Sequence, residues 1–359
     1  MNIDLLDYVL PPELIATHPA EPRDTARLMI VQCGTGQIEH VTVRDMAERF
    51  CSSDLLVRND TAVLAARLIG QRASDGARGG GRVEGLFLSS HDNGDWSVML
   101  TAGGKLTEGE VITLNGSGSE RATLRLKSRE GRYWRAAVEV CDSPEAVLSQ
   151  LGRTPLPPYI LKARKARGEV VDEHVDRAWY RTIFARSDRM GSVAAPTAGL
   201  HFTQEIDARI AEIGVRQAAV TLDVGEGTFR PVTATRLEDH DMHFESWSVD
   251  ADAVDILRSG PACGGRLIAV GTTTTRVLES LPVELPEGPL SGDTDLLIAP
   301  GHGFRRVDGL LTNFHLPRST LLALVAAFTG LELLHEIYSI AVEERYRFYS
   351  YGDAMLVLP

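Results

Sequence analysis

The residues best suited to chemistry lie in one short stretch near the middle of the chain, Gly191 to Thr203, which reads GSVAAPTAGLHFT. Within it, Thr197, Gly199 and His201 bring a hydroxyl, a bare backbone and an imidazole into one tight bend. Such a bend lets the main chain approach a ligand closely while polar groups stay available. The stretch predicts a binding loop; the alternative is an ordinary surface loop with a solvated histidine.

The same local design recurs elsewhere in the chain. An apolar run short enough to be a buried strand ends abruptly in polar residues or glycine. In α/β proteins the site gathers where strands end and loops begin, so we expect these ends to share one cleft. The five further runs are Asp54 to Thr61, Val220 to Phe229, Leu267 to Arg276, Asp295 to Gly301 and Leu310 to His315.

Titratable side chains stand on or next to these ends, where acid and base chemistry on a bound organic substrate would need them. Two common catalytic signatures are missing, since the sequence contains neither GxSxG nor HExxH. The candidates for an acid or a base are Asp60, His201, Asp223, His315 and Asp353.

Four threonines, Thr272 to Thr275, follow a predicted strand over Leu267 to Val270 and open a predicted helix. The first amides of a helix have no partner within it, so such a start suits an anion or a carboxylate. The stretch is not a P-loop, because no lysine follows the glycine at the required spacing. A plain threonine cap is the alternative.

The segment DHDMHFE raises the question of a metal, because His240, His243 and Glu245 are possible ligands. The spacing HxxH is not diagnostic, and in an extended segment the two histidines would point to opposite faces. We expect no metal and favour hydrogen bonding in the cleft or plain surface polarity. The four cysteines lie far apart and indicate neither a zinc site nor a disulfide.

The composition is that of a soluble globular protein of 359 residues with a formal net charge of -12. We expect no membrane-spanning stretch and no signal peptide, and therefore a cytoplasmic protein. The charge argues against a surface covered with nucleic-acid-binding residues, although one basic patch suffices for an RNA backbone. The best such patch is Lys162, Arg164, Lys165 and Arg167, with a solvated helix face as the alternative.

The order of predicted strands and helices favours an α/β fold with a mainly parallel sheet or barrel. From about Leu68 to Val140, short β-rich pieces alternate with glycine turns, which predicts a small all-β module inserted into the main fold. We therefore expect a main α/β domain over 1–67 and 151–359 and an inserted all-β domain over 68–150.

In their order along the chain, these motifs resemble those of the S-adenosylmethionine:tRNA ribosyltransferase-isomerase family. The match spans nearly the whole chain and rests on Asn59-Asp60-Thr61 with Arg67, and on APTAGLHFT, VGEGTF, GTTTTRVLES, TDLLIAPG, TNFHLPRSTLL and YRFYSYGDAM. The resemblance implies an α/β-barrel-like main domain with an inserted small antiparallel barrel-like domain. It also implies transfer and isomerisation of the ribosyl moiety of S-adenosylmethionine onto 7-aminomethyl-7-deazaguanine in tRNA, which gives epoxyqueuosine, adenine and methionine without a metal or redox cofactor.

The resemblance also suggests roles. His201 or His315 would act as base or acid, and Asp60 and Asp353 would orient ribose hydroxyls or the substrate amine. The nest of Thr272, Thr273 and Thr274 with Arg276 would hold the methionine carboxylate. The further substrate-binding candidates are Asn59, Arg67, Thr197, Gly199, Gly227, Phe229, Asn313 and Ser319.

Two places depart from the family pattern. The sequence TLDVG has Asp223 where the family usually has histidine, and GRTPLPPYI has Arg153 and Thr154 where histidine and methionine are usual. A carboxylate in place of an imidazole changes both the charge and the capacity to donate a proton. The alternatives are therefore a relative that uses S-adenosylmethionine with a small-molecule acceptor, and a non-catalytic binding protein. We expect a monomer.

Overall fold

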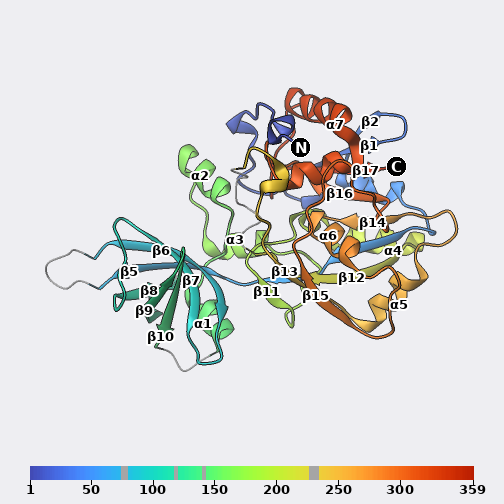
Figure 1. Ribbon diagram of the computed structural model, residues 1–359. Helices are drawn as coiled ribbons and strands as arrows, with labels where there is room; N and C mark the ends of the chain where they lie inside the picture. Colours follow the sequence, from blue (N-terminus) through green and yellow to red (C-terminus); the bar gives the residue numbers. More distant parts are fainter. Residues whose placement is uncertain (74–79, 117–119, 140–142, 226–233) are drawn as a thin grey trace.

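The computed structural model describes residues 1–73, 80–116, 120–139, 143–225 and 234–359. Figure 1 shows a large α/β domain that holds both chain termini and a smaller β-barrel that projects from one side of it. The barrel is built from one continuous part of the chain, between β5 (Arg67–Arg72) and β10 (Tyr133–Val138). The predicted fold class, a main α/β domain with an inserted antiparallel barrel, is confirmed.

The main domain is organised around a nine-stranded mixed sheet with two edge strands, β15 and β2. Both faces of its centre are buried, which explains why several strands read as continuous apolar runs. In spatial order the strands are β15 (Leu290–Thr294), β13 (Glu245–Val249), β12 (Arg216–Leu222), β3 (Leu55–Asn59), β14 (Leu267–Val270), β16 (Gly309–Asn313), β17 (Ala354–Leu358), β1 (Arg27–Gln32) and β2 (Gln37–Thr42).

Strands β12, β3, β14 and β16 are neighbours and run parallel to one another. Their carboxyl ends therefore lie at the same edge of the sheet. Strand β17 runs antiparallel to β16 and pairs Ala354 with Asn313, so its amino end lies at that edge as well. This topology brings residues from distant parts of the sequence to one place.

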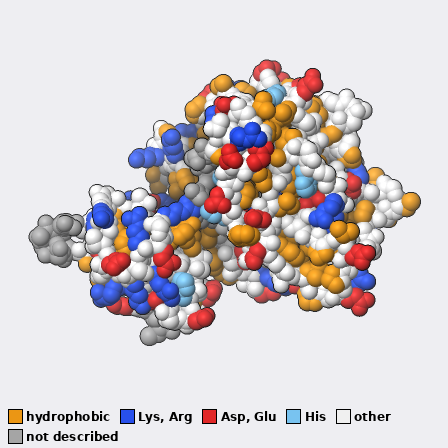
Figure 2. All heavy atoms as spheres, viewed as in Figure 1, with side chains coloured by type: hydrophobic (Ala, Val, Ile, Leu, Met, Phe, Trp, Pro, Cys, Tyr) orange, Lys and Arg blue, Asp and Glu red, His pale blue; other side chains and the backbone are white. Residues whose placement is uncertain are grey.

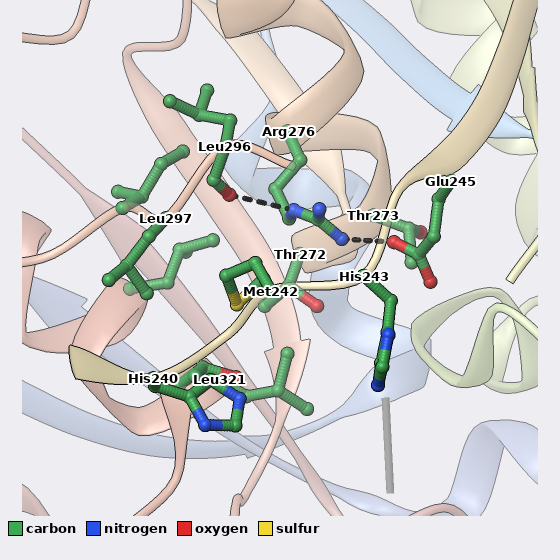
Figure 3. A pocket seen from close by; sticks show the side chains of 13 residues that line it. His240, Met242, His243, Glu245, Thr272, Thr273, Arg276, Leu296, Leu297 and Leu321 are labelled. Atoms are coloured by element: carbon green, nitrogen blue, oxygen red, sulfur yellow. Dashed lines mark hydrogen bonds and ion pairs between the residues drawn. The ribbon is translucent and has the colours of Figure 1, made fainter. Parts of the chain in front are cut away.

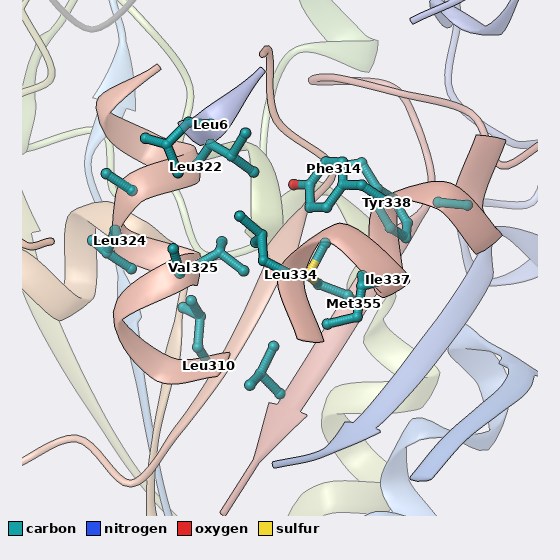
Figure 4. Close-up of a cluster of buried hydrophobic side chains, with 14 of the residues drawn as sticks. Leu6, Leu310, Phe314, Leu322, Leu324, Val325, Leu334, Ile337, Tyr338 and Met355 are labelled. Atoms are coloured by element: carbon teal, nitrogen blue, oxygen red, sulfur yellow. The ribbon is translucent and has the colours of Figure 1, made fainter. Parts of the chain in front are cut away.

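The alternation of side chains along β1 shows how the sheet is covered. Leu28 and Ile30 belong to a buried cluster with residues of α4 (Gln204–Ile213), whereas Met29 and Val31 belong to a cluster on α7 (Thr320–Glu343). Figure 4 shows the second cluster, in which side chains of α7 meet those of β16 and β17. Each face of the sheet is thus sealed by helices.

Helix boundaries follow recognisable end signals. Helix α4 begins after Thr203, whose hydroxyl accepts a hydrogen bond from the Ile206 amide, and ends at Gly214 in the left-handed conformation. The other helices are α1 (Pro144–Leu151), α2 (Pro158–Arg167), α3 (Glu173–Trp179), α5 (Ala251–Ser259) and α6 (Thr272–Ser280), with 3-10 turns η1 (Ile3–Leu6), η2 (Pro12–Leu14), η3 (Arg23–Thr25), η4 (Val43–Arg49), η5 (Thr197–His201) and η7 (Leu237–Asp239).

Helix α7 differs from the expectation that no stretch would be long and apolar enough to cross a membrane. By length and composition its 24 residues pass that test. The helix is broken at Gly330, where φ is 73°, and one side of it packs into the main core. Gly330 therefore divides α7 into two helical segments, as a left-handed glycine commonly ends a helix.

The inserted barrel is closed, with strands in the order β10-β7-β6-β5-β8-β9. Its interior is filled by one apolar cluster that includes Trp96 and Trp134, and α1 contributes Val147, Leu148 and Leu151 to the same cluster. The remaining strands of this part are β6 (Arg82–Ser90), β7 (Trp96–Ala102), β8 (Val111–Asn115) and β9 (Arg121–Glu130), and β4 (Ala62–Val63) pairs with β11 (Met190–Ser192) beside the barrel.

One predicted strand is wrong. The run Asp295 to Gly301 is irregular, and the strand of this region, β15, ends one residue before it. The run was apolar because Leu296, Leu297 and Ile298 pack against the core and line a small cavity, which does not require an extended backbone.

Candidate active site

A cavity of about 310 Å³ lies at the sheet edge where the parallel strands end. Four segments that are distant in sequence form its wall: the central loop at η5, the start of α6, the turn from β16 into α7, and the aromatic stretch before β17. The lining residues are 195–198, 271–273, 312–321, Tyr349 and Ser350, together with Tyr159 and Val224. Three of the strand ends singled out in the sequence, those of the runs Val220 to Phe229, Leu267 to Arg276 and Leu310 to His315, thus meet the central loop here.

Asn313 is the centre of a hydrogen-bond network at the cavity wall. Its Oδ1 accepts from the Thr197 hydroxyl at 2.9 Å, and its Nδ2 donates to the Tyr349 carbonyl and to Nε2 of His201, both at 3.1 Å. These three hydrogen bonds, two to side chains and one to a backbone carbonyl, fix the Asn313 amide in one orientation. Asn313 and Thr197 therefore present polar atoms at fixed positions beside the cavity.

His201 does not line the cavity and lies behind Asn313. Burial, followed by the charges of Arg347 and Arg23, lowers its pKa to about 3, so the ring is neutral at physiological pH. A neutral ring that accepts from Asn313 carries its proton on Nδ1. The geometry makes His201 a residue that positions Asn313, in contrast to the direct acid or base suggested by its place in the loop.

His315 is the histidine that lines the cavity. Its Nε2 lies 2.8 Å from the Thr312 hydroxyl, and its backbone amide donates to the hydroxyl of Tyr338 at 3.0 Å. Burial lowers the pKa of His315 to about 3. The ring is thus neutral and, when Nε2–H donates to Thr312, has a lone pair on Nδ1 that can accept a proton.

Two helix N-termini face the same cavity. Thr272 and Thr273 at the start of α6 line it, and so do Ser319 and Thr320 at the start of α7. Ser319 caps α7 by accepting from the Leu322 amide. Amides in the first turn of a helix have no partner within the helix and favour negative charge, so this wall suits a carboxylate.

The sequence predicted that Thr274 and Arg276 would join Thr272 and Thr273 in holding the carboxylate. Both side chains instead bond to other parts of the protein. The hydroxyl of Thr274 donates to the Val270 carbonyl, and Arg276 forms a buried ion pair with Glu245. The Arg276 guanidinium also donates to the carbonyls of Leu296 and Thr294, at 3.0 and 3.3 Å. Its charge is used inside the protein, so the carboxylate role expected for it is not supported by this geometry.

Figure 3 shows this pair beside a cavity of about 40 Å³ that adjoins the larger one and shares Thr272, Thr273, Thr320 and Leu321 with it. His240 and His243 line the small cavity, as does Glu245. Within the described ranges, no group of three or more His, Cys, Asp and Glu side chains is placed to hold a metal ion.

Asp60 and Asp223 follow β3 and β12 at the same edge but do not line the 310 Å³ cavity. Each carboxylate accepts a hydrogen bond from a threonine next to the other strand's end. Asp60 accepts from the Thr221 hydroxyl at 2.6 Å, and Asp223 accepts from the Thr61 hydroxyl at 3.0 Å. Burial raises the pKa of both carboxyls, opposed by these bonds and by nearby arginines. Gly191 makes room for this pair, because a Cβ there would clash with the Asp223 carboxylate.

Several other predicted binding residues have structural partners. Asn59 bridges β3 and β12 through the backbone of Leu222. The Asp353 carboxylate is buried and accepts from the Arg347 side chain and from the amides of Arg27 and Arg347. Gly199 packs against Thr182. These contacts do not support the ligand roles expected for these three residues.

The predicted basic patch is smaller than expected. Arg164 is buried, pairs with Asp176 and donates to the Thr17 carbonyl, so it does not belong to an RNA-facing surface. Lys162 and Lys165 are exposed on α2, and Arg167 is exposed while donating to carbonyls of the N-terminal segment. Arg67 lies on the barrel, and Gly227 and Phe229 lie outside the described residues.

The sequence did not identify the aromatic part of the cavity. The rings of Tyr159 and Tyr349 stack with centroids 4.2 Å apart, and the Tyr159 hydroxyl bonds to Ser350 at 2.5 Å. Phe314 completes this side of the lining. The stretch FYSYGDAM and the segment LPPYI were the available signals, but only the topology shows that they meet.

The structure combines an α/β domain that contains an inserted β-barrel with a cavity at the carboxyl ends of parallel strands, which is where α/β proteins commonly bind ligands. Comparison with known proteins gives the family. The model of the queuosine biosynthesis protein family matches residues 3–357, and the chain belongs to this family.

Relatives named S-adenosylmethionine:tRNA ribosyltransferase-isomerase match over the full length. The protein from Halothermothrix orenii is 41% identical over 100% of both chains, and that from Anaeromyxobacter dehalogenans is 44% identical over 100% of this chain and 99% of the relative. The crystal structure of S-adenosylmethionine tRNA ribosyltransferase from Thermotoga maritima is similar with a TM-score of 0.53, at 34% identity over 99% of this chain and 100% of that one.

Proposed function

We propose that this protein is an S-adenosylmethionine:tRNA ribosyltransferase-isomerase. It transfers and isomerises the ribosyl moiety of S-adenosylmethionine onto 7-aminomethyl-7-deazaguanine in tRNA, releasing adenine and methionine. The observation that carries the proposal is the cavity at the strand ends, in a chain that matches enzymes of this name over its full length. The small-molecule alternative is not favoured, since the change to Asp223 occurs at a position outside the cavity lining.

The cavity offers a suitable surface for each part of S-adenosylmethionine. The N-termini of α6 and α7 suit the methionine carboxylate. The stacked rings of Tyr159 and Tyr349 suit the adenine base or the sulfonium, because an aromatic face attracts a cation and packs against a flat ring. Thr197 and Asn313 suit the ribose hydroxyls, because their polar atoms are held in place by the network described above.

His315 is the proposed base. A sulfonium makes the neighbouring C5′ hydrogen acidic, so a neutral imidazole placed beside it can accept that proton and start the rearrangement. The proton can then return from the imidazolium to adenine as it leaves. His201 acts on this step only through Asn313, and Asp60 and Asp223 hold the ends of β3 and β12 that border the site.

In this proposal the main domain binds S-adenosylmethionine and the inserted domain faces the tRNA. The main domain, 1–67 and 151–359, holds the cavity, and the inserted domain, 68–150, lies where the tRNA approaches. Lys162, Lys165 and Arg167 on α2 lie between them and contact the RNA backbone. We further propose that the protein acts as a cytoplasmic monomer without a metal.

The experiment is an adenine-release assay with S-adenosylmethionine, run with tRNA that carries 7-aminomethyl-7-deazaguanine, with the same tRNA carrying guanine, and with the free base. Release only with the first substrate supports the proposal. Release with the free base alone would replace it with the small-molecule reaction, and no release under any of these conditions would leave a binding protein.

A further inference from the structure

A second hollow, separate from the active-site cavity, lies between the barrel and the start of α2. It encloses about 760 Å³ and is here called the interdomain groove. Arginines line it from three places on the barrel: Arg67 on β5, Arg82 on β6, and Arg132 in the turn before β10. Its other lining is mostly apolar and includes Leu86, Met99, Pro155, Leu156, Pro157, Pro158, Leu161 and Val193.

The positive charge of the chain is concentrated in the barrel, which forms one wall of this groove. Residues 67–138 contain 11 Lys and Arg against 8 Asp and Glu, a net charge of +3. Since the whole chain has a net charge of -12, the remainder carries -15. Figure 2 shows Lys and Arg side chains gathered over the barrel and over α2. A polyanion is therefore drawn to the barrel side of the molecule and repelled elsewhere.

Two segments of the chain contribute lining residues to both the groove and the active-site cavity. Pro158 lines the groove and the next residue, Tyr159, lines the cavity. Val193 lines the groove and Ala195, two residues on, lines the cavity. An extended strand that lies in the groove can thus continue into the cavity.

We propose that the interdomain groove binds the unpaired RNA nucleotides next to the target base. The arginines contact phosphates, and the apolar lining packs against bases that are not stacked in a helix. This combination of cations and apolar surface is what single-stranded nucleic acid requires, since neither feature alone holds both backbone and base. The inference rests on the proposed function and specifies where its RNA substrate lies.

Glu84 is the acidic residue of the groove, and it restrains two of the arginines. Its carboxylate lies 2.9 Å from Arg67 and 2.8 Å from Arg82, and these cations lower its pKa, so it stays ionised. The Arg82 side chain is 65% exposed, and a pair this exposed is weak. A phosphate can therefore replace Glu84 as the partner of Arg82 with little loss of interaction free energy.

The test compares Arg82→Gln/Arg132→Gln with a matched control, Arg121→Gln/Arg125→Gln. The control removes the same charge from β9, which lies on the opposite wall of the barrel from β6. Adenine release is measured as a function of tRNA concentration at several salt concentrations. For the groove variant we expect the KM for tRNA to rise about tenfold or more and its logarithmic salt dependence to weaken by about 1.4, since each phosphate contact to a single strand contributes about 0.7.

The KM for S-adenosylmethionine should stay unchanged in both variants, and the control should keep the KM for tRNA. Glu84→Gln should act in the opposite sense and lower the KM for tRNA. The inference would be overturned if the groove variant kept the wild-type KM for tRNA, or if the KM for tRNA rose equally in the control. In either case the activity of the wild-type protein would leave the proposed function standing. A wild-type protein that does not turn over tRNA would instead remove the proposed function, and the groove proposal with it.

Discussion

The buried pair of Arg276 and Glu245 should be a stabilising contact at the base of the site and not a contact to the ligand. Their side chains are 8% and 4% exposed, and they connect α6 to β13. Arg276→Met removes the guanidinium from the buried Glu245 carboxylate and removes the donor for the carbonyls of Leu296 and Thr294. Loss of one partner of a buried pair costs about 3–5 kcal/mol, so we expect that loss in the free energy of unfolding.

A double-mutant cycle with Glu245→Leu measures the pair itself. The double variant no longer contains a buried charge that has lost its ion-pair partner in this contact, so it should be less destabilised than the sum of the single variants by about 2–3 kcal/mol. Urea unfolding of the four proteins, compared at constant m-value, gives these energies. Additivity within about 0.5 kcal/mol, or a stable Arg276→Met variant whose KM for S-adenosylmethionine rises tenfold or more, would refute the reasoning and place the guanidinium on the ligand.

Three further predictions concern the residues around the site. His315→Gln should lower kcat for adenine release by about 10²–10⁴, as expected for loss of a general base, with the KM for S-adenosylmethionine within a few fold of wild type; a kcat within tenfold would remove His315 from the chemistry. The pKa of His201 is about 3 in the folded protein and about 6.5 in the unfolded chain, so the unfolded chain binds more protons and the free energy of unfolding should fall as the pH drops below 6.5. His201→Gln should reduce the slope of that free energy against pH by up to about 1.4 kcal/mol per pH unit between pH 4 and 6. An unchanged slope in urea unfolding would contradict the assignment. Gly191→Ala should destabilise the protein by about 1–3 kcal/mol in thermal unfolding because its Cβ displaces the Asp223 carboxylate, and Asp223→Ala in the same chain should restore most of the loss; equal damage with and without Asp223 would show that the clash lies elsewhere.

Local sequence patterns predicted much of the fold because they report on the faces and ends of single elements. The glycine turns between Leu68 and Val140 predicted the inserted barrel. Thr203 and Gly214 are residue types that commonly begin and end a helix, as they do in α4. The strand ends at Val270 and Asn313 were identified by a change from apolar to polar residues, and parallel pairing brings them to one edge. The breaks in these patterns are local, so no knowledge of the tertiary structure is needed to see them.

The partners of individual polar side chains were not predictable in the same way. Arg276 meets Glu245 across 31 positions and Arg164 meets Asp176 across 12, and nothing in either local pattern specifies that the pair is buried. His201 looked like a catalytic group because its neighbours are small and polar, yet Asn313, 112 residues away, separates it from the cavity. Which residue faces a ligand and which supports it from behind depends on packing that only the tertiary structure contains.

The most direct measurement of the proposed reaction is transfer of the ribosyl group itself. S-adenosylmethionine labelled in its ribose is incubated with the protein and tRNA carrying 7-aminomethyl-7-deazaguanine, and the label is counted in the recovered tRNA. Label in this tRNA, in equal amount to the adenine released and absent from tRNA carrying guanine, is the predicted result. Adenine release without any label in the tRNA would contradict it, because the ribosyl group would then have gone to another acceptor.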